Sequence, residues 1–193
     1  IDTTPKRLPP IYAYHTHPLV PLRQALNPLI GKIQGLDHFI QIAKQECHFP
    51  SEHGLTKEES AAIYLYTMDW GEDSLYRLLN QALREEDRSV LIPWNGYIKL
   101  FDTALNKLPN HKNILWRGLN KNISKNYVAG TEIIWWYFSS CSSAISVVKQ
   151  FLGPVSTLLM IDAHNGKDIS LYSNFPKEKE VVLGLGTRIR VAD

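Results

Sequence analysis

The spacing of apolar residues changes once along this chain, near Asn113, and this change limits the folds that are open to it. Before Asn113, apolar residues recur three and four positions apart, as on one face of a helix. After Asn113, they gather in short β-branched and aromatic runs that glycines separate, as in strands. Helices that precede strands without alternating with them indicate an α+β fold and argue against a doubly wound sheet.

The helical part has clear start and stop signals. Thr56 and Glu59 have the spacing of a capping box, which predicts a helix start at that point. Pro50 and Pro109 each follow a helical pattern and are expected to end it. The predicted helices cover residues 36–43, 56–67, 75–83 and 94–108.

The second half is predicted to consist mainly of strands. The expected strands are residues 114–117, 131–139, 156–162, 168–172, 180–185 and 187–191, with a short helix over 146–151. Residues 1–28 are rich in proline, which excludes a long regular element there, so we expect an extended arm over 1–35. The chain then reads as one domain of 193 residues, with the arm followed by a helical part (36–112) and a β-rich core (113–193).

Composition excludes several functional classes. Lys and Arg number 21 against 19 Asp and Glu, a net charge of +2 that gives no sign of a nucleic-acid partner. There is no apolar run of membrane-spanning length, and the first residues lack the pattern of a signal peptide, so the sequence indicates no compartment. Cys47 and Cys141 are too few for a disulfide framework, although one bridge between them stays open. The histidines have no spacing that predicts a metal site.

The first feature that could carry chemistry is the triplet Glu178-Lys179-Glu180, at the start of a predicted strand. Side chains alternate along a strand, so the two carboxylates are expected on one face, about 7 Å apart, with Lys179 on the other. Two carboxylates at that distance are a common way to obtain an acid and a base from the same group. The alternative is a solvated strand edge.

Two further features precede this triplet. Arg117-Gly118 ends an apolar run, and such an arginine offers a planar fork of donors to phosphate or carboxylate, unless it is an ordinary surface strand end. An aromatic run then leads into Ser139-Ser140-Cys141-Ser142, whose hydroxyl groups are able to orient a carboxylate, unless they form a serine-rich turn.

In this order and spacing, the three features resemble the arginine-specific mono-ADP-ribosyltransferases, whose motifs are an Arg, a Ser-x-Ser and a Glu-x-Glu on successive strands. The resemblance implies that Arg117 clamps the NAD phosphates and that the Gly118 backbone contacts the nicotinamide amide. It implies that Ser140 orients Glu180, the catalytic carboxylate, and that Glu178 confers specificity for arginine. It also implies a β-rich NAD-binding core of two packed sheets.

Other positions match the family less fully. Residues 172–177 would form the target-recognising turn, with Phe175 as its exposed aromatic side chain. Phe151 would stack on nicotinamide, unless it belongs to the core. Cys141 replaces the family's Thr, and an accessory phosphate-binding Arg is not evident beside Gly153.

The resemblance implies an NAD-dependent transferase that moves ADP-ribose to an arginine of a target protein and releases nicotinamide. Its partners would be NAD, as co-substrate, and an arginine-containing protein, without a metal and without nucleic acid; we expect a monomer. Two alternatives stay open: an NAD glycohydrolase on the same site, in which water replaces arginine, and a non-catalytic NAD-binding module.

Overall fold

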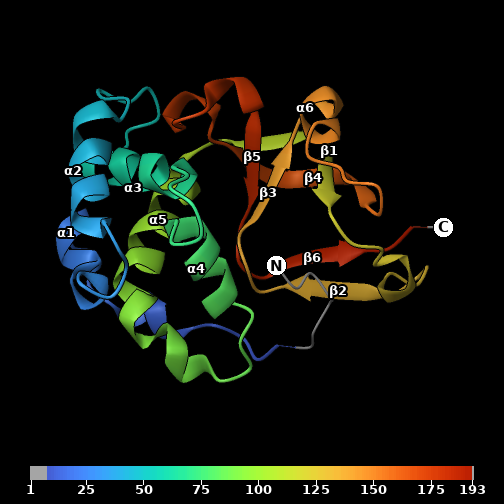
Figure 1. Ribbon diagram of the computed structural model, residues 1–193, viewed down its shortest axis with the longest axis horizontal. Coiled ribbons are helices and arrows are strands. Elements are labelled where there is room, and N and C mark those ends of the chain that lie inside the picture. Colours follow the sequence, from blue (N-terminus) through green and yellow to red (C-terminus); the bar gives the residue numbers. More distant parts are fainter. Residues whose placement is uncertain (1–7, 193) are drawn as a thin grey trace.

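The computed structural model describes residues 8–192. Its first half is helical and forms the blue-to-green side of the molecule in Figure 1. The α-helices of this half are α1 (Leu22–Ala25), α2 (Leu36–Glu46), α3 (Lys57–Thr67), α4 (Leu75–Ala82) and α5 (Asn95–Lys107). All four predicted helices are therefore confirmed, with ends that differ by a few residues.

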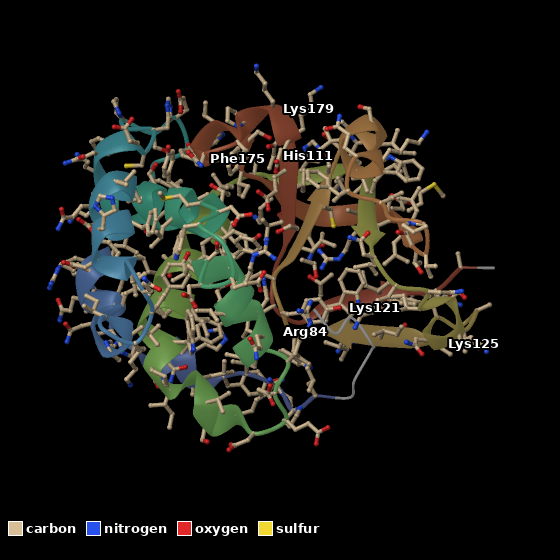
Figure 2. The ribbon with its side chains drawn as sticks, in the orientation of Figure 1. Arg84, His111, Lys121, Lys125, Phe175 and Lys179 are labelled. Atoms are coloured by element: carbon tan, nitrogen blue, oxygen red, sulfur yellow. The ribbon has the colours of Figure 1, made fainter. Side chains whose placement is uncertain are left out.

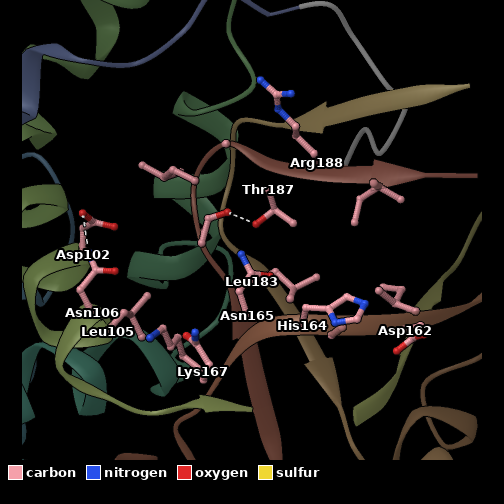
Figure 3. A pocket seen from close by; sticks show the side chains of 17 residues that line it. Asp102, Leu105, Asn106, Asp162, His164, Asn165, Lys167, Leu183, Thr187 and Arg188 are labelled. Carbon is pink, nitrogen blue, oxygen red and sulfur yellow. Dashed lines mark hydrogen bonds between the residues drawn. The ribbon is translucent and has the colours of Figure 1, made fainter. Parts of the chain in front are cut away.

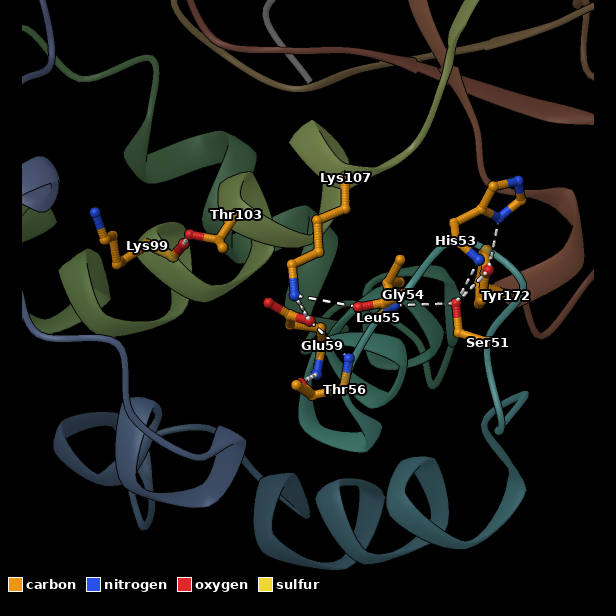
Figure 4. A network of polar contacts seen from close by, with 10 residues as sticks. All are labelled: Ser51, His53, Gly54, Leu55, Thr56, Glu59, Lys99, Thr103, Lys107 and Tyr172. Carbon is orange, nitrogen blue, oxygen red and sulfur yellow. Dashed lines mark hydrogen bonds and ion pairs between the residues drawn. The ribbon is translucent and has the colours of Figure 1, made fainter.

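The capping box at the start of α3 is confirmed. Thr56 Oγ1 accepts a hydrogen bond from the Glu59 amide at 3.2 Å, and Glu59 Oε2 accepts one from the Thr56 amide at 2.7 Å. Glu59 is buried, and its charge is compensated by Lys107 of α5, whose Nζ lies 2.7 Å from Oε2 (Figure 4). The cap thus fixes the first turn of α3 and joins this helix to α5.

The second half forms two antiparallel sheets, which confirms the α+β class. A closed sheet has the strand order β1-β3-β5-β4, and a separate pair is formed by β2 and β6. The short helix α6 lies against β1 and β3. The elements of this half are β1 (Asn110–Leu119), β2 (Glu132–Trp135), β3 (Ser139–Ser142), α6 (Ile145–Lys149), β4 (Thr157–Asp168), β5 (Glu180–Leu183) and β6 (Thr187–Arg190).

Three sequence predictions need correction, and the first concerns the arm. Residues 8–35 are not extended throughout, because three short turns of helix, Ala13–Thr16, Leu22–Ala25 and Asn27–Leu29, interrupt the segment. Prolines fit here because Pro21 precedes the first turn of α1 and Pro28 lies at the start of the next, where a missing N–H costs little. Leu22 and Leu26 are fully buried, so these turns are part of the core. The predicted arm's first residues, 1–7, lie outside the described part of the chain.

The other two corrections concern strand boundaries. The predicted strand 168–172 is wrong, because β4 runs on through Gly166 to Asp168 and Ser170–Tyr172 is a turn of 3-10 helix. Gly166 does not end the strand; a Cβ there would lie 2.7 Å from Cγ1 of Val181, so glycine allows β4 to cross beside β5. The predicted strand 131–139 is divided into β2 and β3, each of which belongs to a different sheet.

An aromatic cluster joins the helical half to the strands. Phe101 of α5 stacks on Tyr66 of α3 at 4.6 Å between ring centroids and meets Phe138, just before β3, edge-on at 4.8 Å. Cys47 and Cys141 are buried, free thiols, so no bridge forms between them. Within residues 8–192, no helix combines the length and the apolar character needed to cross a membrane.

Candidate active site

A cleft of about 400 Å³ lies between β1, β3, α6, the start of β5 and α4. Most of the residues singled out from the sequence line it: Arg117, Gly118, Ser140, Phe151, Glu178 and Glu180. Residues that are up to 63 positions apart in the chain are thus brought to one place. Phe175, labelled in Figure 2, does not line the cleft; it is exposed at the turn before β5.

Strand pairing explains this convergence. Ser142 of β3 is paired with Trp116 of β1 on one side and with Glu180 of β5 on the other, so the three motifs lie side by side across three strands. Within the described residues, β1 and β3 pair at that single position, whereas β1 pairs with β4 over most of its length. Strands β1 and β3 therefore diverge on either side of this pair, and the cleft opens between them.

Glu178 reaches the cleft in a different way from the one the sequence suggested. It is not in a strand: Pro176–Glu178 is a turn of 3-10 helix, and Lys179 takes the left-handed conformation with φ 48°. Ser142 Oγ donates a hydrogen bond to the Glu178 carbonyl at 2.7 Å, which anchors the turn to β3. The predicted placement of Glu178 and Glu180 on one face of a strand is therefore wrong, because β5 begins only at Glu180; both carboxylates nevertheless line the cleft.

The Glu180 carboxyl group has an unusual protonation equilibrium. Burial raises its pKa to about 7, and the negative charge of Glu178 acts in the same direction. A hydrogen bond from Ser140 and the positive charge of Arg117 act in the opposite direction. The carboxylate is therefore partly protonated at neutral pH, as is often found for groups in catalytic sites.

Glu178 is also shifted. Burial raises the pKa of its carboxyl group, and the charge of Asp69, in the loop after α3, acts in the same direction. Asp69 is held there by hydrogen bonds from Tyr76 and Arg77, at 3.2 and 3.3 Å. Tyr76 and Arg77 both line the cleft, so its α4 wall carries a positive charge that no sequence motif indicates. The only sequence signal for Tyr76 and Arg77 was their position on the polar side of a predicted helix.

Arg117 and Gly118 are held by the packing around them. Arg117 Nη1 donates to the Ser140 carbonyl at 2.6 Å, which leaves its other N–H groups for a ligand. A Cβ at Gly118 would lie 2.7 Å from Cδ2 of Leu152 and 3.0 Å from Val148, so glycine is needed here for α6 and the residues after it to pack on β1.

The structure shows that the Cys141 thiol is buried and that the Phe151 ring is exposed. Burial raises the pKa of the Cys141 thiol to about 11, so the group is neutral at physiological pH, and its Sγ donates to the Ser139 carbonyl. The alternative that Phe151 is part of the core is wrong: its side chain is 58% exposed at the edge of the cleft. It is available to a ligand.

Two other side chains behind the cleft carry no obvious sequence signal. Tyr66, fully buried in α3, lies 3.3 Å from Ser140 Oγ through its hydroxyl group and accepts a hydrogen bond from Asn80. Arg84 lies over the ring of Tyr137 at 4.2 Å, between α4 and the β2–β6 pair in Figure 2. Both contacts join the helical half to residues beside the motifs.

A larger cavity, of about 640 Å³, lies elsewhere between α5, β4 and the β5–β6 connection (Figure 3). Its lining includes Asp102, His164, Lys167 and Arg188, and none of the residues that the motifs predicted. Among residues 8–192, no group of three or more His, Cys, Asp or Glu side chains is placed to hold a metal ion. The convergence of the three motifs therefore makes the smaller cleft the candidate active site.

Comparison with known proteins agrees with this assignment. The chain is 29% identical over 146 residues to a Mycobacterium avium (strain 104) protein named as the NAD(+)–arginine ADP-ribosyltransferase Mav. That match covers 75% of this chain but 17% of Mav, so the chain spans about one sixth of the length of this curated relative.

Solved structures show the same fold. The eukaryotic mono-ADP-ribosyltransferase ART2.2 superposes with a TM-score of 0.68 at 18% identity, over 89% of this chain and 84% of that one. The Vis toxin, an ADP-ribosyltransferase from Vibrio splendidus, gives 0.60 at 22% identity, over 95% and 84% of the two chains.

The family model described as NAD:arginine ADP-ribosyltransferase matches residues 32–192, which span both halves of the fold and the whole cleft. The chain therefore belongs to the NAD:arginine ADP-ribosyltransferase family.

Proposed function

We propose that this chain transfers ADP-ribose from NAD to an arginine guanidinium of a target protein and releases nicotinamide. The observation that carries the proposal is the meeting of Arg117, Ser140, Glu178 and Glu180 in one cleft of a chain that belongs to this family. The Vis structure determined in complex with agmatine, a free guanidine, is consistent with an arginine-like acceptor.

NAD binding is assigned to the side of the cleft formed by β1 and α6. The Arg117 guanidinium offers parallel N–H groups to the pyrophosphate, while its bond to the Ser140 carbonyl keeps it aligned. The backbone of Gly118 contacts the nicotinamide amide, and the exposed ring of Phe151 stacks on nicotinamide. No metal ion is needed for this binding, because the guanidinium supplies the positive charge.

Glu180 acts on the bond that breaks. When the bond between ribose and nicotinamide breaks, positive charge develops on the ribose as in glycoside hydrolysis, and a carboxylate beside it stabilises that charge. Glu180 does this in its ionised form, so a pKa of about 7 implies that NAD cleavage rises with pH through neutrality. Ser140 orients the carboxylate through its hydrogen bond.

Glu178 acts on the acceptor. A guanidinium has a pKa above about 12 and is a poor nucleophile until a base aligns it and accepts a proton. Glu178 lies beside Glu180 but on a separate turn, and Phe175 of the same turn is exposed toward an incoming protein. Attack then occurs on the ribose face opposite the departing nicotinamide, with inversion at the anomeric carbon.

The glycohydrolase alternative uses the same cleft with water as acceptor and would not need Glu178. The presence of that carboxylate in the cleft favours transfer over hydrolysis. A non-catalytic module would bind NAD without releasing nicotinamide. Incubation with labelled NAD and agmatine separates the three: adduct indicates a transferase, free ADP-ribose alone a hydrolase, and intact bound NAD a module.

Two variants test the division of roles. Glu180→Gln should lower both nicotinamide release and adduct formation by about a hundredfold or more, because it removes the charge opposite the developing cation. Glu178→Gln should lose adduct formation while NAD cleavage to free ADP-ribose persists, because only the acceptor step needs the second base. Adduct formed at the parent rate by Glu178→Gln, or normal cleavage by Glu180→Gln, would contradict these roles.

A further inference from the structure

Tyr66 is a buried tyrosine whose hydroxyl group points from the helical half to the cleft. Its side chain is 1% exposed, and its ring is fixed by stacking on Phe101 at 4.6 Å. The hydroxyl oxygen lies 3.2 Å from Asn80 Nδ2 and 3.3 Å from Ser140 Oγ. A buried tyrosine hydroxyl needs such partners, but here one of them is the serine beside the candidate catalytic carboxylate.

The chemistry of the partners sets the direction of these hydrogen bonds. The amide nitrogen of Asn80 donates, so the Tyr66 oxygen accepts there and its own proton is free for Ser140 Oγ. Ser140 Oγ then accepts from Tyr66 and keeps its proton for the Glu180 carboxylate, whose pKa the Ser140 hydroxyl group lowers. The two hydrogen bonds of Tyr66 thus lead from α4 through α3 to β3, where Ser140 faces the same cleft as Glu180, the first residue of β5.

Glu180 is sensitive to such a donor because its other neighbours oppose one another. The charge of Arg117 on β1 favours the ionised carboxylate, whereas burial and the charge of Glu178 on the turn disfavour it. Cys141 and Tyr66 are both neutral near pH 7, because burial raises their pKa values to about 11 and about 12. Tyr76 and the cationic Arg77, on the α4 wall, complete the polar lining of the cleft. With the pKa of Glu180 at about 7, one hydrogen bond changes the ionised fraction.

We propose that Tyr66, oriented by Asn80, is a positioning residue that fixes Ser140 as a hydrogen-bond donor to Glu180 and so keeps that carboxylate ionised and aligned for NAD cleavage. The effect of Tyr66 on NAD cleavage rests on the proposed function. The effect of Tyr66 on the ionisation of Glu180 is a property of the protein alone, and it is measured without NAD.

The decisive measurement is the titration of Glu180 by NMR of carboxyl ¹³C-labelled glutamate, with the signal assigned by its loss in Glu180→Gln. In Tyr66→Phe we expect the Glu180 midpoint to move to higher pH by about one pH unit, because a hydrogen bond that stabilises the charged form is weakened. Asn80→Leu, which leaves the Tyr66 hydroxyl group free to rotate, should move it in the same direction by a smaller amount. Unchanged midpoints in both variants overturn the proposal.

Tyr97→Phe is the matched control. Tyr97 belongs to the same aromatic stack, 5.8 Å from Phe101, and its buried hydroxyl group donates to the Ala62 carbonyl, away from the cleft. The Tyr97→Phe variant loses a buried hydrogen bond of the same kind as Tyr66→Phe does. Its loss of thermal stability should therefore match that of Tyr66→Phe, while the titration midpoint of Glu180 stays unchanged. An equal midpoint shift in Tyr97→Phe would show a general effect of packing and overturn the proposal.

The kinetic counterpart is nicotinamide release as a function of pH. Tyr66→Phe should lower kcat at pH 7 by about tenfold with little change in the KM for NAD, and higher pH should restore part of the rate. The two hypotheses fail separately. A parent chain that releases no nicotinamide contradicts the proposed function, and the NMR titration still decides the role of Tyr66. A shifted titration supports that role whichever reaction the cleft performs.

Discussion

At the scale of single residues, the cleft places two identical side chains in different chemical environments. Glu178 and Glu180 are two positions apart, but one ends a 3-10 turn and the other begins a strand paired to Ser142. Burial raises the pKa of both carboxyl groups, with the charge of Asp69 acting in the same direction at Glu178; at Glu180, where the charge of Glu178 adds to burial, the pKa is raised to about 7. Their roles therefore follow from backbone placement, since the side chains are identical.

The ionisation of Glu180 predicts a dependence of stability on pH. The pKa of this carboxyl group is 4.5 when it is freely exposed to water, as in the unfolded chain, and about 7 in the folded protein, so between these pH values the folded state binds the proton more tightly. The free energy of unfolding should therefore fall as pH rises through this window, and Glu180→Gln should remove that loss. We expect the variant to be more stable than the parent by about 3 kcal/mol at pH 8 and equally stable at pH 4, measured by urea unfolding.

Equal stabilities of Glu180→Gln and the parent at pH 8 would show that the ionised Glu180 carboxylate does not destabilise the folded state. Such a result would count against a raised pKa and leave the role of Glu180 to kinetics alone. Gains at both pH values would instead indicate a packing effect of the amide.

Arg117 provides a second prediction at this scale. Its guanidinium uses Nη1 on the Ser140 carbonyl and keeps other N–H groups for phosphate, which a lysine ammonium, as a point charge, does not reproduce. Arg117→Lys should therefore weaken NAD binding by about tenfold or more although the charge is retained. Calorimetric titration of NAD into both proteins measures the effect, and equal affinities would remove Arg117 from the binding site.

At the scale of elements, the segment from Ser170 to Glu178 is tied to the helical half by side chains. Tyr64 of α3 donates to Asn174 Oδ1 at 2.7 Å, and the Asn174 amide donates to Thr67 Oγ1 at 2.8 Å. Tyr172 OH lies 2.7 Å from both Ser51 Oγ and His53 Nδ1 in the loop before α3 (Figure 4). The turn that carries Glu178 is therefore positioned by α3 and the loop before it as well as by its own strand.

Loosening this attachment should affect the acceptor step first. Asn174→Ala removes the partner of Tyr64 and should destabilise the fold by about 1 kcal/mol. Because Glu178 lies on this turn and Glu180 lies in a paired strand, the ratio of agmatine adduct to free ADP-ribose should fall severalfold while total nicotinamide release changes little. Leu171→Ala, at an exposed position of the same segment, serves as the control and should leave the ratio unchanged. An unaltered ratio in Asn174→Ala would argue that the turn is rigid without α3.

At the scale of the whole molecule, the helical half and the strand half share one core. Phe138 lies between β2 and β3, is 1% exposed, and packs edge-on against Phe101 of α5 and Tyr66 of α3. The cleft is built from both halves, with α4 on one side and β1, β3 and the turn before β5 on the other. We therefore propose that the chain unfolds as one cooperative domain.

Phe138→Ala tests whether the two halves unfold together as one domain. Loss of a buried phenylalanine should lower the free energy of unfolding by about 3 to 5 kcal/mol, and circular dichroism of the helices and tryptophan fluorescence should still report one common transition. Phe151→Ala, at the exposed edge of the cleft, should change stability by less than about 0.5 kcal/mol. Two separate transitions in the Phe138 variant would indicate that the halves are independent domains.

Local patterns in the sequence were sufficient for the order of elements and for the motifs. The helix over Lys57–Thr67 could be predicted because its capping box is local, and the strand signals around Arg117 and Val182 needed only short apolar runs. Arg117, Ser140, Glu178 and Glu180 could be named because each belongs to a short motif whose order along the chain is itself informative.

Tertiary structure alone decided how these motifs meet. The alternation rule failed at Glu178 because it holds only where a backbone is paired, and pairing of β5 with β3 begins at Glu180. The predicted strands 156–162 and 168–172 leave Gly166 between them, because the sequence does not show that Val181 lies beside this glycine and that β4 therefore continues through it. Tyr66 has no sequence signal for its place behind the cleft, because the polar partners of its hydroxyl group lie 14 and 74 residues away in the chain. Strand pairing and buried hydrogen bonds join residues distant in the chain, so their energetics depend on packing that no short window of sequence contains.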